Sequence, residues 1–413
     1  MLDLEELLRK TVELKASDLH LTVGSPPCCR IFGEMTKMPF PEIARDELRS
    51  LLMTTLTGEQ QNRFEEKRDL DFSLEVPGIA RFRANFFVGR RGEGAVFRVI
   101  PTKILSADEL GLPTAIKQLA HLEKGLVLVT GPTGSGKSTT LAALIDLVNQ
   151  ERAGHILTVE DPIEFVHQHK RCLVNQREVR IHTESFASAL RAALREDPDV
   201  ILVGEMRDLE TIGLAVSAAE TGHLVFGTLH TSSAAQTIDR IIDVFPPHQQ
   251  SQIRTQLSES VQAVVAQALI PKIGGGRAAS LEIMLSTTAV RNLIREGKTF
   301  QLPSVIETNT NMGMQTAEQH MKALILAGTI TVEAALSKGL PPDALRGLDV
   351  PVQRAAPQSF PPVTPAPPPR VELSTPSVVS ESTPAPVEPS HVSAITPFDD
   401  DDFGDLKPLS NAA

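Results

Sequence analysis

Short, nearly continuous apolar runs alternate with helical segments through the middle of the chain. The apolar runs are LVLVT, HILTVE, VILVGE and HLVFGTL, at residues 126–130, 155–160, 200–205 and 223–229. Segments with helical periodicity separate them, at residues 138–150, 185–196 and 208–220. Strands without polar alternation are typical of a sheet that is covered on both faces. We therefore predict an α/β fold with a largely parallel sheet from about residue 120 to about residue 245.

The segments on either side of this region have different patterns. The chain begins with MLDLEELLRK, which indicates an amphipathic helix, and strand-like runs follow at ARFRANFFVG and GAVFRVI. These runs predict a small α+β domain over residues 1–100, followed by a linker at 101–118. From about residue 249 to 340 the pattern indicates mostly helix. We therefore expect a second domain at 119–340 whose carboxy-terminal part is helical.

A proline-rich segment fills residues 341–413 and contains more than half of the 30 prolines of the chain. Such a composition cannot bury enough apolar surface to fold alone, so it predicts a disordered tail. The tail ends in FDDDDFGDL, in which apolar residues flank an acidic block at residues 398–406. This block is either part of a solvated spacer or a short peptide that docks on a partner.

Composition and charge exclude several classes of protein. The net charge of −11 and the isoelectric point near 5.5 disfavour general nucleic-acid binding, which requires a basic surface. The three cysteines lack the spacing of a zinc site or a disulfide framework, which is consistent with a reducing cytoplasm. No run approaches the roughly 18 apolar residues of a membrane span, so we expect a cytoplasmic protein.

The strongest chemical signal is GPTGSGKST, which fits the phosphate-binding pattern G-x-x-x-x-G-K-[ST] and lies between a predicted strand and a predicted helix. In such a loop, backbone N–H groups surround phosphate oxygens, Lys137 contacts the β- and γ-phosphates, and the Ser138 hydroxyl binds Mg²⁺. The candidate nucleotide-binding residues are Gly131, Pro132, Thr133, Gly134, Ser135, Gly136, Lys137, Ser138 and Thr139.

Acidic residues follow two of the predicted strands. Glu205 ends the run VILVGE, and we assign it as the Walker B acid, which acts on Mg²⁺ from a strand beside the phosphate-binding loop. The run ILTVEDPIEF places Glu160, Asp161 and Glu164 at the end of another strand. Clustered carboxylates near a nucleotide can orient water or accept its proton. The residues alone leave open whether Glu160 or Glu164 is the general base.

Histidine and arginine complete the set of candidates. His223 and His230 bracket the run LVFGTL, and His230 is at its carboxyl end, where it could sense the γ-phosphate. Arg81 and Arg83 share one face of a predicted strand, and Arg98 follows on the next strand. These arginines are either solvent-facing or suited to reach phosphate from a neighbouring subunit.

Four motifs occur in the order of one known family: the phosphate-binding loop, TVEDPIE, VILVGEMRD and TGHLVFGTLHT. Over about residues 1–340 the chain resembles the secretion ATPase superfamily, which powers type II and type IV secretion and type IV pili. The segments NQREV, PKIGGGR, RNLIRE and GMQT are similar to the pilus-retraction branch of that family. The segment TTAVRNLIREGK differs from that branch at Val290, where alanine is usual, and the proline-rich tail is a further departure.

The resemblance implies a homo-hexamer that hydrolyses ATP with Mg²⁺ to drive pilus retraction and twitching motility. Each PAS-like amino-terminal domain would pack on the RecA-like domain of the next subunit, with ATP between them. Glu164 would be the general base, Glu205 the Walker B acid, and Arg83 and Arg98 would reach a neighbour's nucleotide. The implied location is the cytoplasmic base of the pilus machine, on a platform protein of the inner membrane.

Other functions stay open from the sequence. An assembly or secretion motor usually has a longer amino-terminal region and often a four-cysteine zinc module, and this chain has neither. The segment RNLIRE argues against an accessory retraction ATPase. A non-hydrolysing ATP switch would not need Glu164 and Glu205. A nucleic-acid motor is disfavoured because the chain lacks tryptophan and tyrosine for base stacking.

Overall fold

Two β-sheets organise the chain in the computed structural model, which describes residues 2–31, 33–100 and 103–346. The first sheet belongs to the amino-terminal region and the second to the region that carries the nucleotide motifs. Each sheet has its own buried apolar core. The α/β class expected from the sequence is confirmed.

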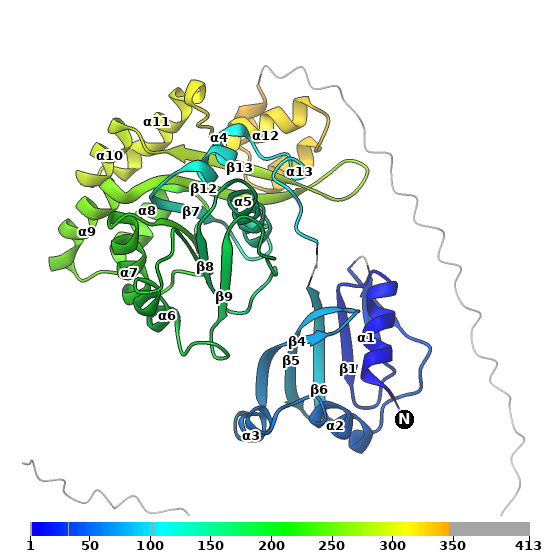
Figure 1. The fold of residues 1–413 in the computed structure, drawn as a ribbon. Helices are drawn as coiled ribbons and strands as arrows, with labels where there is room; N and C mark the ends of the chain where they lie inside the picture. The colour runs from blue at the N-terminus through cyan, green and yellow to red at the C-terminus, as the bar shows by residue number, and fades with distance from the viewer. Residues whose placement is uncertain (1, 32, 101–102, 347–413) are drawn as a thin grey trace, which may run out of the picture. The chain divides into compact units, whose positions relative to one another are not determined.

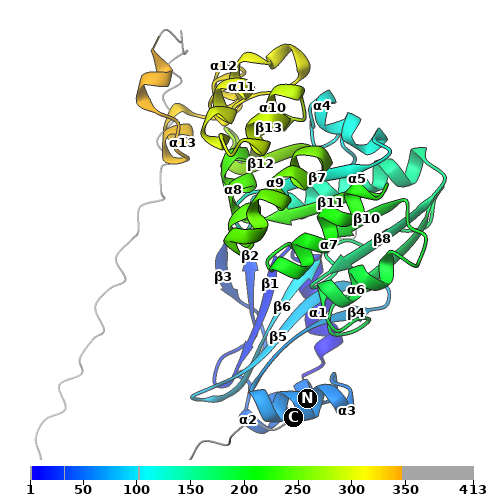
Figure 2. The same ribbon diagram turned by 90° about the vertical axis from the view of Figure 1, so that its left-hand side faces the viewer.

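The amino-terminal sheet is antiparallel and has the strand order β3-β2-β1-β6-β5-β4. Its strands are β1 (Asp18–Thr22), β2 (Cys28–Ile31), β3 (Glu34–Lys37), β4 (Asp69–Val76), β5 (Ala80–Gly89) and β6 (Gly92–Ile100). Three helices accompany it, α1 (Leu4–Glu13), α2 (Arg45–Met53) and α3 (Gly58–Lys67), and Figure 2 shows α2 and α3 close together. The amphipathic first helix is confirmed, since Leu4, Leu7 and Leu8 are buried.

The second sheet has the order β13-β12-β7-β11-β10-β8-β9 and is parallel except for β13. Its strands are β7 (Gly125–Thr130), β8 (His155–Glu160), β9 (Leu173–Glu178), β10 (Val200–Val203), β11 (Leu224–Leu229), β12 (Val261–Pro271) and β13 (Arg277–Leu285). The helices between and before these strands are α4 (Thr114–Lys117), α5 (Lys137–Glu151), α6 (Phe186–Ala193), α7 (Leu209–Glu220), α8 (Ala234–Asp243) and α9 (Pro247–Ser260).

The side chains of β7 show why this sheet is covered on both faces. All six of its residues are buried. Leu126 and Leu128 belong to the cluster that includes α7, α8 and α9, whereas Val127 and Val129 belong to the cluster that includes α5. Alternate residues of a strand point to opposite faces, so a strand between two helical layers must be apolar throughout. Figure 1 shows the helices on the two sides of the sheet, and the predicted parallel arrangement is confirmed.

The expectation of mostly helix from residue 249 to 340 is wrong for its central part. Strands β12 and β13 occupy Val261–Pro271 and Arg277–Leu285 and form an antiparallel pair. Helix α9 ends at Ser260 and β12 begins at the next residue, without a Gly or Pro between them. The apolar run of β12 therefore looks like a continuation of the helix. Its burial between β7 and β13 decides its conformation, and that contact is not visible in the local sequence.

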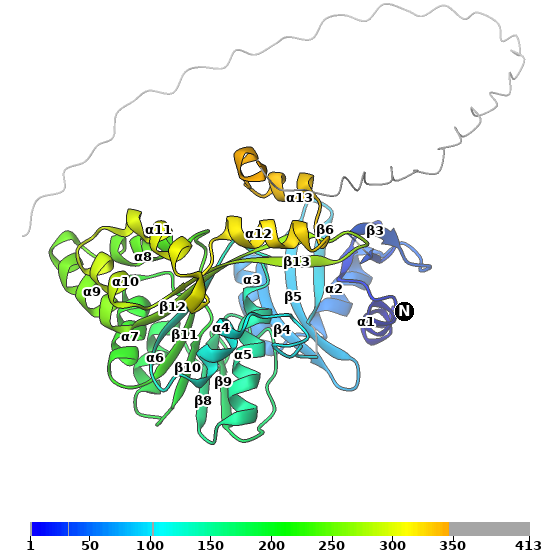
Figure 3. The same ribbon diagram turned by 90° about the horizontal axis from the view of Figure 1, so that it is seen from above.

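The residues after β13 are helical, as expected. The helices are α10 (Thr288–Arg295), α11 (Leu302–Thr308), α12 (Ala317–Leu326) and α13 (Val332–Ser337). Short 3-10 helices lie at Gln118–His121, Thr299–Gln301, Thr310–Met312 and Pro342–Leu345. Helix α12 packs along β13, as Figure 3 shows.

Residues 347–413 of the proline-rich tail lie outside the described residues, and so does the acidic block at 398–406. The start of the tail at 341 is placed too early, because Pro342–Leu345 forms a 3-10 helix whose Ala344 and Leu345 pack against a buried cluster. Among the helices in the described ranges, none is both long enough and apolar enough to cross a membrane.

Candidate active site

The loop GPTGSGKST connects β7 to α5, as the motif requires. Gly131 has φ of 141°, and a Cβ atom there would clash with the backbone oxygen of Gln267 on β12. Gly136 has φ of 89° and caps the amino terminus of α5 in a left-handed conformation. Both positions therefore require glycine, because side chains are strained at such φ values. The loop leads into the amino terminus of α5, where the free backbone N–H groups of a helix make a favourable place for an anion.

Lys137 is buried at the first turn of α5, with 8% of its surface exposed. Its Nζ donates to the carbonyl oxygens of Gly131 at 2.9 Å and Pro132 at 3.1 Å. Burial lowers the pKa of Lys137, and the carboxylates of Glu205 and Glu164 act in the opposite direction. Both acids are therefore close enough to Lys137 to act on its charge.

Gln267 on β12 supports this loop, and it is not among the site residues that the sequence predicts. Its Nε2 donates to the carbonyl oxygen of Ser135 at 2.7 Å, and its Oε1 accepts from the Thr140 hydroxyl at 2.9 Å. The side chain is buried and joins the loop to the first turn of α5. No sequence motif points to Gln267, because the pattern around it predicts helix where the structure has strand β12.

Glu205 follows the buried strand β10, as expected. One expectation is corrected, since β10 does not lie beside β7: strand β11 separates them. Glu205 is nevertheless close to Lys137 because all of these parallel strands end at the same edge. The Glu205 carboxylate pairs with Arg207 and with His230, whose Nε2 is 3.0 Å from Oε1.

The two histidines occupy opposite ends of β11. His230 follows Leu229 at the carboxyl end, where it contacts Glu205. His223 precedes Leu224, and its Nδ1 is 3.0 Å from the carbonyl oxygen of Ala218 at the end of α7. Only His230 therefore lies at the strand end that carries Glu205.

The end of β8 brings Glu160, Asp161 and Glu164 together, as the sequence predicted, but their surroundings differ. The Glu160 carboxylate accepts from the Thr158 hydroxyl at 2.8 Å and from Gln176 Nε2 at 3.1 Å. Burial raises the pKa of Glu160 to about 7, although these hydrogen bonds lower it. Asp161 forms an ion pair, which is described below, whereas the side chain of Glu164 is exposed.

Arg83 and Arg98 face each other across β5 and β6 of the amino-terminal sheet. Arg83 Nε is 3.8 Å from Asp71, and Arg98 Nε is 2.8 Å from Asp18. Their side chains are 46% and 67% exposed, so both guanidinium groups are accessible. Arg81 shares the face of Arg83 but has only 16% of its side chain exposed.

A cavity of about 480 Å³ adjoins the phosphate-binding loop. Its walls combine residues 132–135 of the loop with apolar side chains such as Leu269 and Met321 and with the cations Arg277 and Lys338. This mixture of backbone polar groups, apolar surface and positive charge suits a nucleotide. The buried Ser135 hydroxyl has no hydrogen-bond partner within the described ranges.

The described residues contain no group of three or more His, Cys, Asp or Glu that could hold a metal ion by themselves. Mg²⁺ typically retains water and uses one or two protein ligands together with substrate phosphates. The Ser138 hydroxyl at the start of α5 and the Glu205 carboxylate are compatible with that mode of binding.

A strand, a glycine-rich loop with lysine and serine, and a helix, set on a largely parallel sheet with acids at neighbouring strand ends, define a P-loop nucleoside triphosphatase. Residues 2–275 match the family model described as type II/IV secretion system protein. Because this match covers more than half of the chain, the protein belongs to that family.

Individual relatives agree with this assignment. The chain is 55% identical over 342 residues to the type IV pilus retraction ATPase PilT of Pseudomonas aeruginosa, covering 83% of this chain and 99% of the relative. It is 41% identical over 337 residues to the type IV pilus ATPase PilU of the same organism, covering 81% and 88%. A crystal structure of the pilus retraction motor PilT with bound ADP matches with a TM-score of 0.79 and 49% identity, covering 84% of this chain and 100% of that one.

Because the pKa of Glu160 is raised, the free energy of unfolding should depend on pH in a way that can be measured. The folded state holds this proton up to about pH 7, whereas the unfolded state releases it near 4.5, so stability falls as the pH rises through that window. The slope is about 1.4 kcal/mol per pH unit for one fully titrating group. Glu160→Gln removes this slope, so urea unfolding should show the variant gaining stability relative to wild type between pH 5 and pH 8. Glu333→Gln, at an exposed position, is the control. If the difference in unfolding free energy between Glu160→Gln and wild type does not change with pH, the proposed titration of Glu160 is contradicted.

Proposed function

We propose that the protein is an ATP-hydrolysing motor that drives retraction of a type IV pilus and thereby twitching motility. The observation that carries this proposal is the near-complete match to the Pseudomonas aeruginosa retraction ATPase, at 55% identity over 99% of its length. The site supports it, because a P-loop and a set of strand-end carboxylates provide for both binding and hydrolysis of a nucleotide.

Residues 131–139 would bind the phosphates of ATP through backbone N–H groups, and Lys137 would contact the β- and γ-phosphates. Ser138 and Glu205 would hold Mg²⁺, which supplies positive charge against the phosphates. His230 would respond to the γ-phosphate through its contact with Glu205. The cavity lined by Leu269 and Met321 would receive the remainder of the nucleotide.

Glu164 is the better candidate for the general base. A base must reach the attacking water and must carry a free carboxylate. Glu164 is exposed and near Lys137, whereas the Glu160 carboxylate is held by Thr158 and Gln176 and is easily protonated. Glu164 would therefore take the proton of the water, and Glu160 would keep a structural role.

The active protein is proposed to be a homo-hexamer. In it, the PAS-like domain at residues 1–100 of one subunit packs on the RecA-like domain at 119–340 of the next. Arg83 and Arg98 then act on the phosphates of that neighbour. Their exposure supports this assignment, since accessible guanidinium groups can contact phosphate. Arg83 pairs with the exposed Asp71, whereas Arg98 would have to leave the buried Asp18. The linker at 101–118 would allow the two domains to move with the nucleotide state.

The proposed location is the cytoplasmic side of the inner membrane, on the platform protein at the base of the pilus. The acidic block at 398–406 is a candidate for docking, because its apolar residues could anchor in pockets while its aspartates meet a basic groove. The chain is not proposed to bind nucleic acid.

The alternative functions are an accessory retraction ATPase and an assembly or secretion motor. The 41% identity to PilU keeps the accessory role open, but the identity to PilT is higher over a similar length. A non-hydrolysing ATP switch fits the site less well, because an exposed Glu164 is near enough to the phosphate-binding lysine to act on its charge.

Deletion of the gene tests the direction of the motor. Loss of retraction should leave more surface pili and abolish twitching, and the wild-type gene, but not Lys137→Ala, should restore movement. Surface pili are counted by electron microscopy. An assembly motor would instead leave cells without pili, and an accessory ATPase would leave measurable twitching.

Two substitutions separate binding from hydrolysis in purified protein. Lys137→Ala removes the phosphate-binding charge and should abolish both ATP binding and phosphate release. Glu164→Gln keeps size and hydrogen bonding, so ATP should still bind while turnover falls by about 10² or more. Both are measured by nucleotide titration and steady-state phosphate release. Normal turnover of Glu164→Gln would reassign the base to Glu160 or Glu205.

Mixed hexamers test the arginine assignment. A subunit with Arg83→Ala and Arg98→Ala lacks only the arginines, and a Lys137→Ala subunit lacks only the P-loop charge. Mixing the two should restore some hydrolysis, because certain interfaces then pair intact arginines with an intact P-loop. A mixture of Lys137→Ala with Glu164→Gln is the control without rescue, since both defects lie in one domain. Failure of the first mixture, with mixed hexamers verified, would contradict action in trans.

A further inference from the structure

The segment that carries Glu164 has no regular secondary structure of its own. Between Glu160, the last residue of β8, and Leu173, the first residue of β9, the chain forms bends and irregular backbone. Ile163, Phe165 and His167 are buried, whereas Glu164 and Val166 are exposed. Such a segment lacks the ladder of hydrogen bonds that fixes a strand, so other groups must hold its backbone.

Strand β9 supplies these groups. It pairs in parallel with β8, with Gln176 opposite Thr158 and Glu178 opposite Glu160. Gln176 and Glu178 are two residues apart, so they point to the same side of the strand. Both lie within NQREV, a motif that the site residues assigned so far leave without a role.

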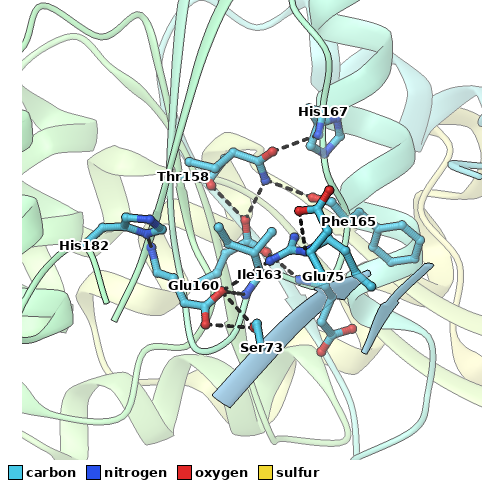
Figure 4. Close-up of polar contacts among 12 residues, drawn as sticks. Ser73, Glu75, Thr158, Glu160, Ile163, Phe165, His167 and His182 are labelled. Atoms are coloured by element: carbon cyan, nitrogen blue, oxygen red, sulfur yellow. Dashed lines mark hydrogen bonds and ion pairs between the residues drawn. The ribbon is translucent and has the colours of Figure 1, made fainter. Parts of the chain in front are cut away.

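Gln176 makes two hydrogen bonds to the segment and one to Glu160 at the end of β8. Its Nε2 donates to the carbonyl oxygen of Phe165 at 2.9 Å and to the Glu160 carboxylate at 3.1 Å. Its Oε1 accepts from the backbone N–H of His167 at 2.8 Å. One amide side chain therefore uses its donor and acceptor groups to fix the backbone just after Glu164, and Figure 4 shows these contacts.

Glu178 holds the backbone on the amino-terminal side of Glu164. Its Oε2 accepts from the backbone N–H of Ile163 at 3.2 Å, and the residue is buried with 3% of its surface exposed. The Ser73 hydroxyl also donates to this carboxylate, at 2.9 and 3.1 Å, and Arg81 Nη2 is 3.7 Å away. Two residues further on, Arg180 Nη2 pairs with Asp161 Oδ2 at 3.0 Å.

These contacts bracket one residue. The N–H of Ile163 and the carbonyl oxygen of Phe165 belong to the two neighbours of Glu164, and both are held from β9. Burial of the Ile163 and Phe165 side chains fixes them further, and the alternation leaves the Glu164 side chain on the exposed side.

We propose that Gln176 and Glu178 are positioning residues for Glu164, which hold the backbone on both sides of it and so place its carboxylate at the nucleotide. The proposal rests on the proposed role of Glu164 as the general base. A general base that is displaced by about 1 Å can lose much of its contribution to the rate, because proton transfer requires close alignment of the base with the attacking water. Loss of these contacts should therefore reduce turnover and leave nucleotide binding to residues 131–139 intact.

Gln176→Leu tests the proposal, because leucine has a similar size and makes none of the three hydrogen bonds. We expect kcat to fall about tenfold or more, while KM for ATP and the affinity for ADP stay within about threefold of wild type. Asn175→Leu is the matched control, since it replaces a neighbouring exposed amide that contacts His155 rather than the Glu164 segment. Equal kcat values for the two variants would overturn the proposal.

A double substitution shows whether Gln176 acts through Glu164. In the Glu164→Gln background, Gln176→Leu should lower kcat by less than about twofold further, because residues that act as one unit are not additive. A full additional loss would show that Gln176 supports the fold and not the base, which would overturn the proposal.

Glu178 provides a second route that does not depend on the folding of Gln176→Leu. Glu178→Gln keeps an acceptor for the Ile163 N–H, whereas Glu178→Leu does not, so the glutamine variant should retain the higher kcat. Equal losses in the two variants would contradict positioning through this hydrogen bond.

Failure of the proposed function is recognised separately. If Glu164→Gln alone keeps normal turnover, the base is elsewhere, whatever the β9 variants do. If Glu164→Gln loses turnover and neither Gln176→Leu nor Glu178→Leu does, the base assignment stands and the positioning role of β9 is refuted.

Discussion

The close approach of β12 to the phosphate-binding loop is the constraint on which the rest of the site depends. The backbone oxygen of Gln267 lies 2.2 Å from where a Cβ of Gly131 would be, and the Gln267 side chain forms hydrogen bonds with both Ser135 in the loop and Thr140 in α5. The loop is thus fixed to the strand next to β7 as well as to the strand from which it comes. A loop that is held from two strands keeps its N–H groups oriented before a phosphate arrives, so little ordering entropy remains to oppose binding.

Two carboxylates only four residues apart receive different properties from their surroundings. Glu160 is held by Thr158 and Gln176 in a site where burial raises its pKa to about 7. Glu164 is exposed and close to the buried ammonium group of Lys137. Pairs of titratable groups in contrasting environments commonly divide the work of a site between them. Gln176 links the two, since it contacts the Glu160 side chain and the backbone beside Glu164.

The parts of the site that the sequence predicted are those with a local signal. Residues 131–139 form a contiguous motif, and Glu164, Glu205 and His230 follow or end apolar runs, so their places at strand ends could be foreseen. The contributions of Gln267 and Gln176 could not. Their strands are hidden, because β12 continues directly from α9, and β9 is the edge strand LVNQRE without an apolar run. Gln267 also meets residues more than 120 positions away, a contact that no local pattern encodes.

The electrostatics of the site also explain why arginines from elsewhere would be useful. Two nearby carboxylates act on the charge of Lys137, and Arg207 is paired with Glu205. Positive charge that is already engaged with acids cannot be given wholly to the phosphates. Arg83 and Arg98 are differently placed, since their ion pairs with Asp71 and Asp18 leave both side chains about half exposed or more. Asp71 is itself exposed, and exposed ion pairs are worth only about 0–1 kcal/mol, so exchanging Asp71 for a phosphate costs Arg83 little. Arg98 would instead leave the carboxylate of Asp18, which is buried. Arg83, at 3.8 Å from its aspartate, is held less closely than Arg98 at 2.8 Å, and it is therefore the arginine that can transfer to a phosphate with the smaller loss.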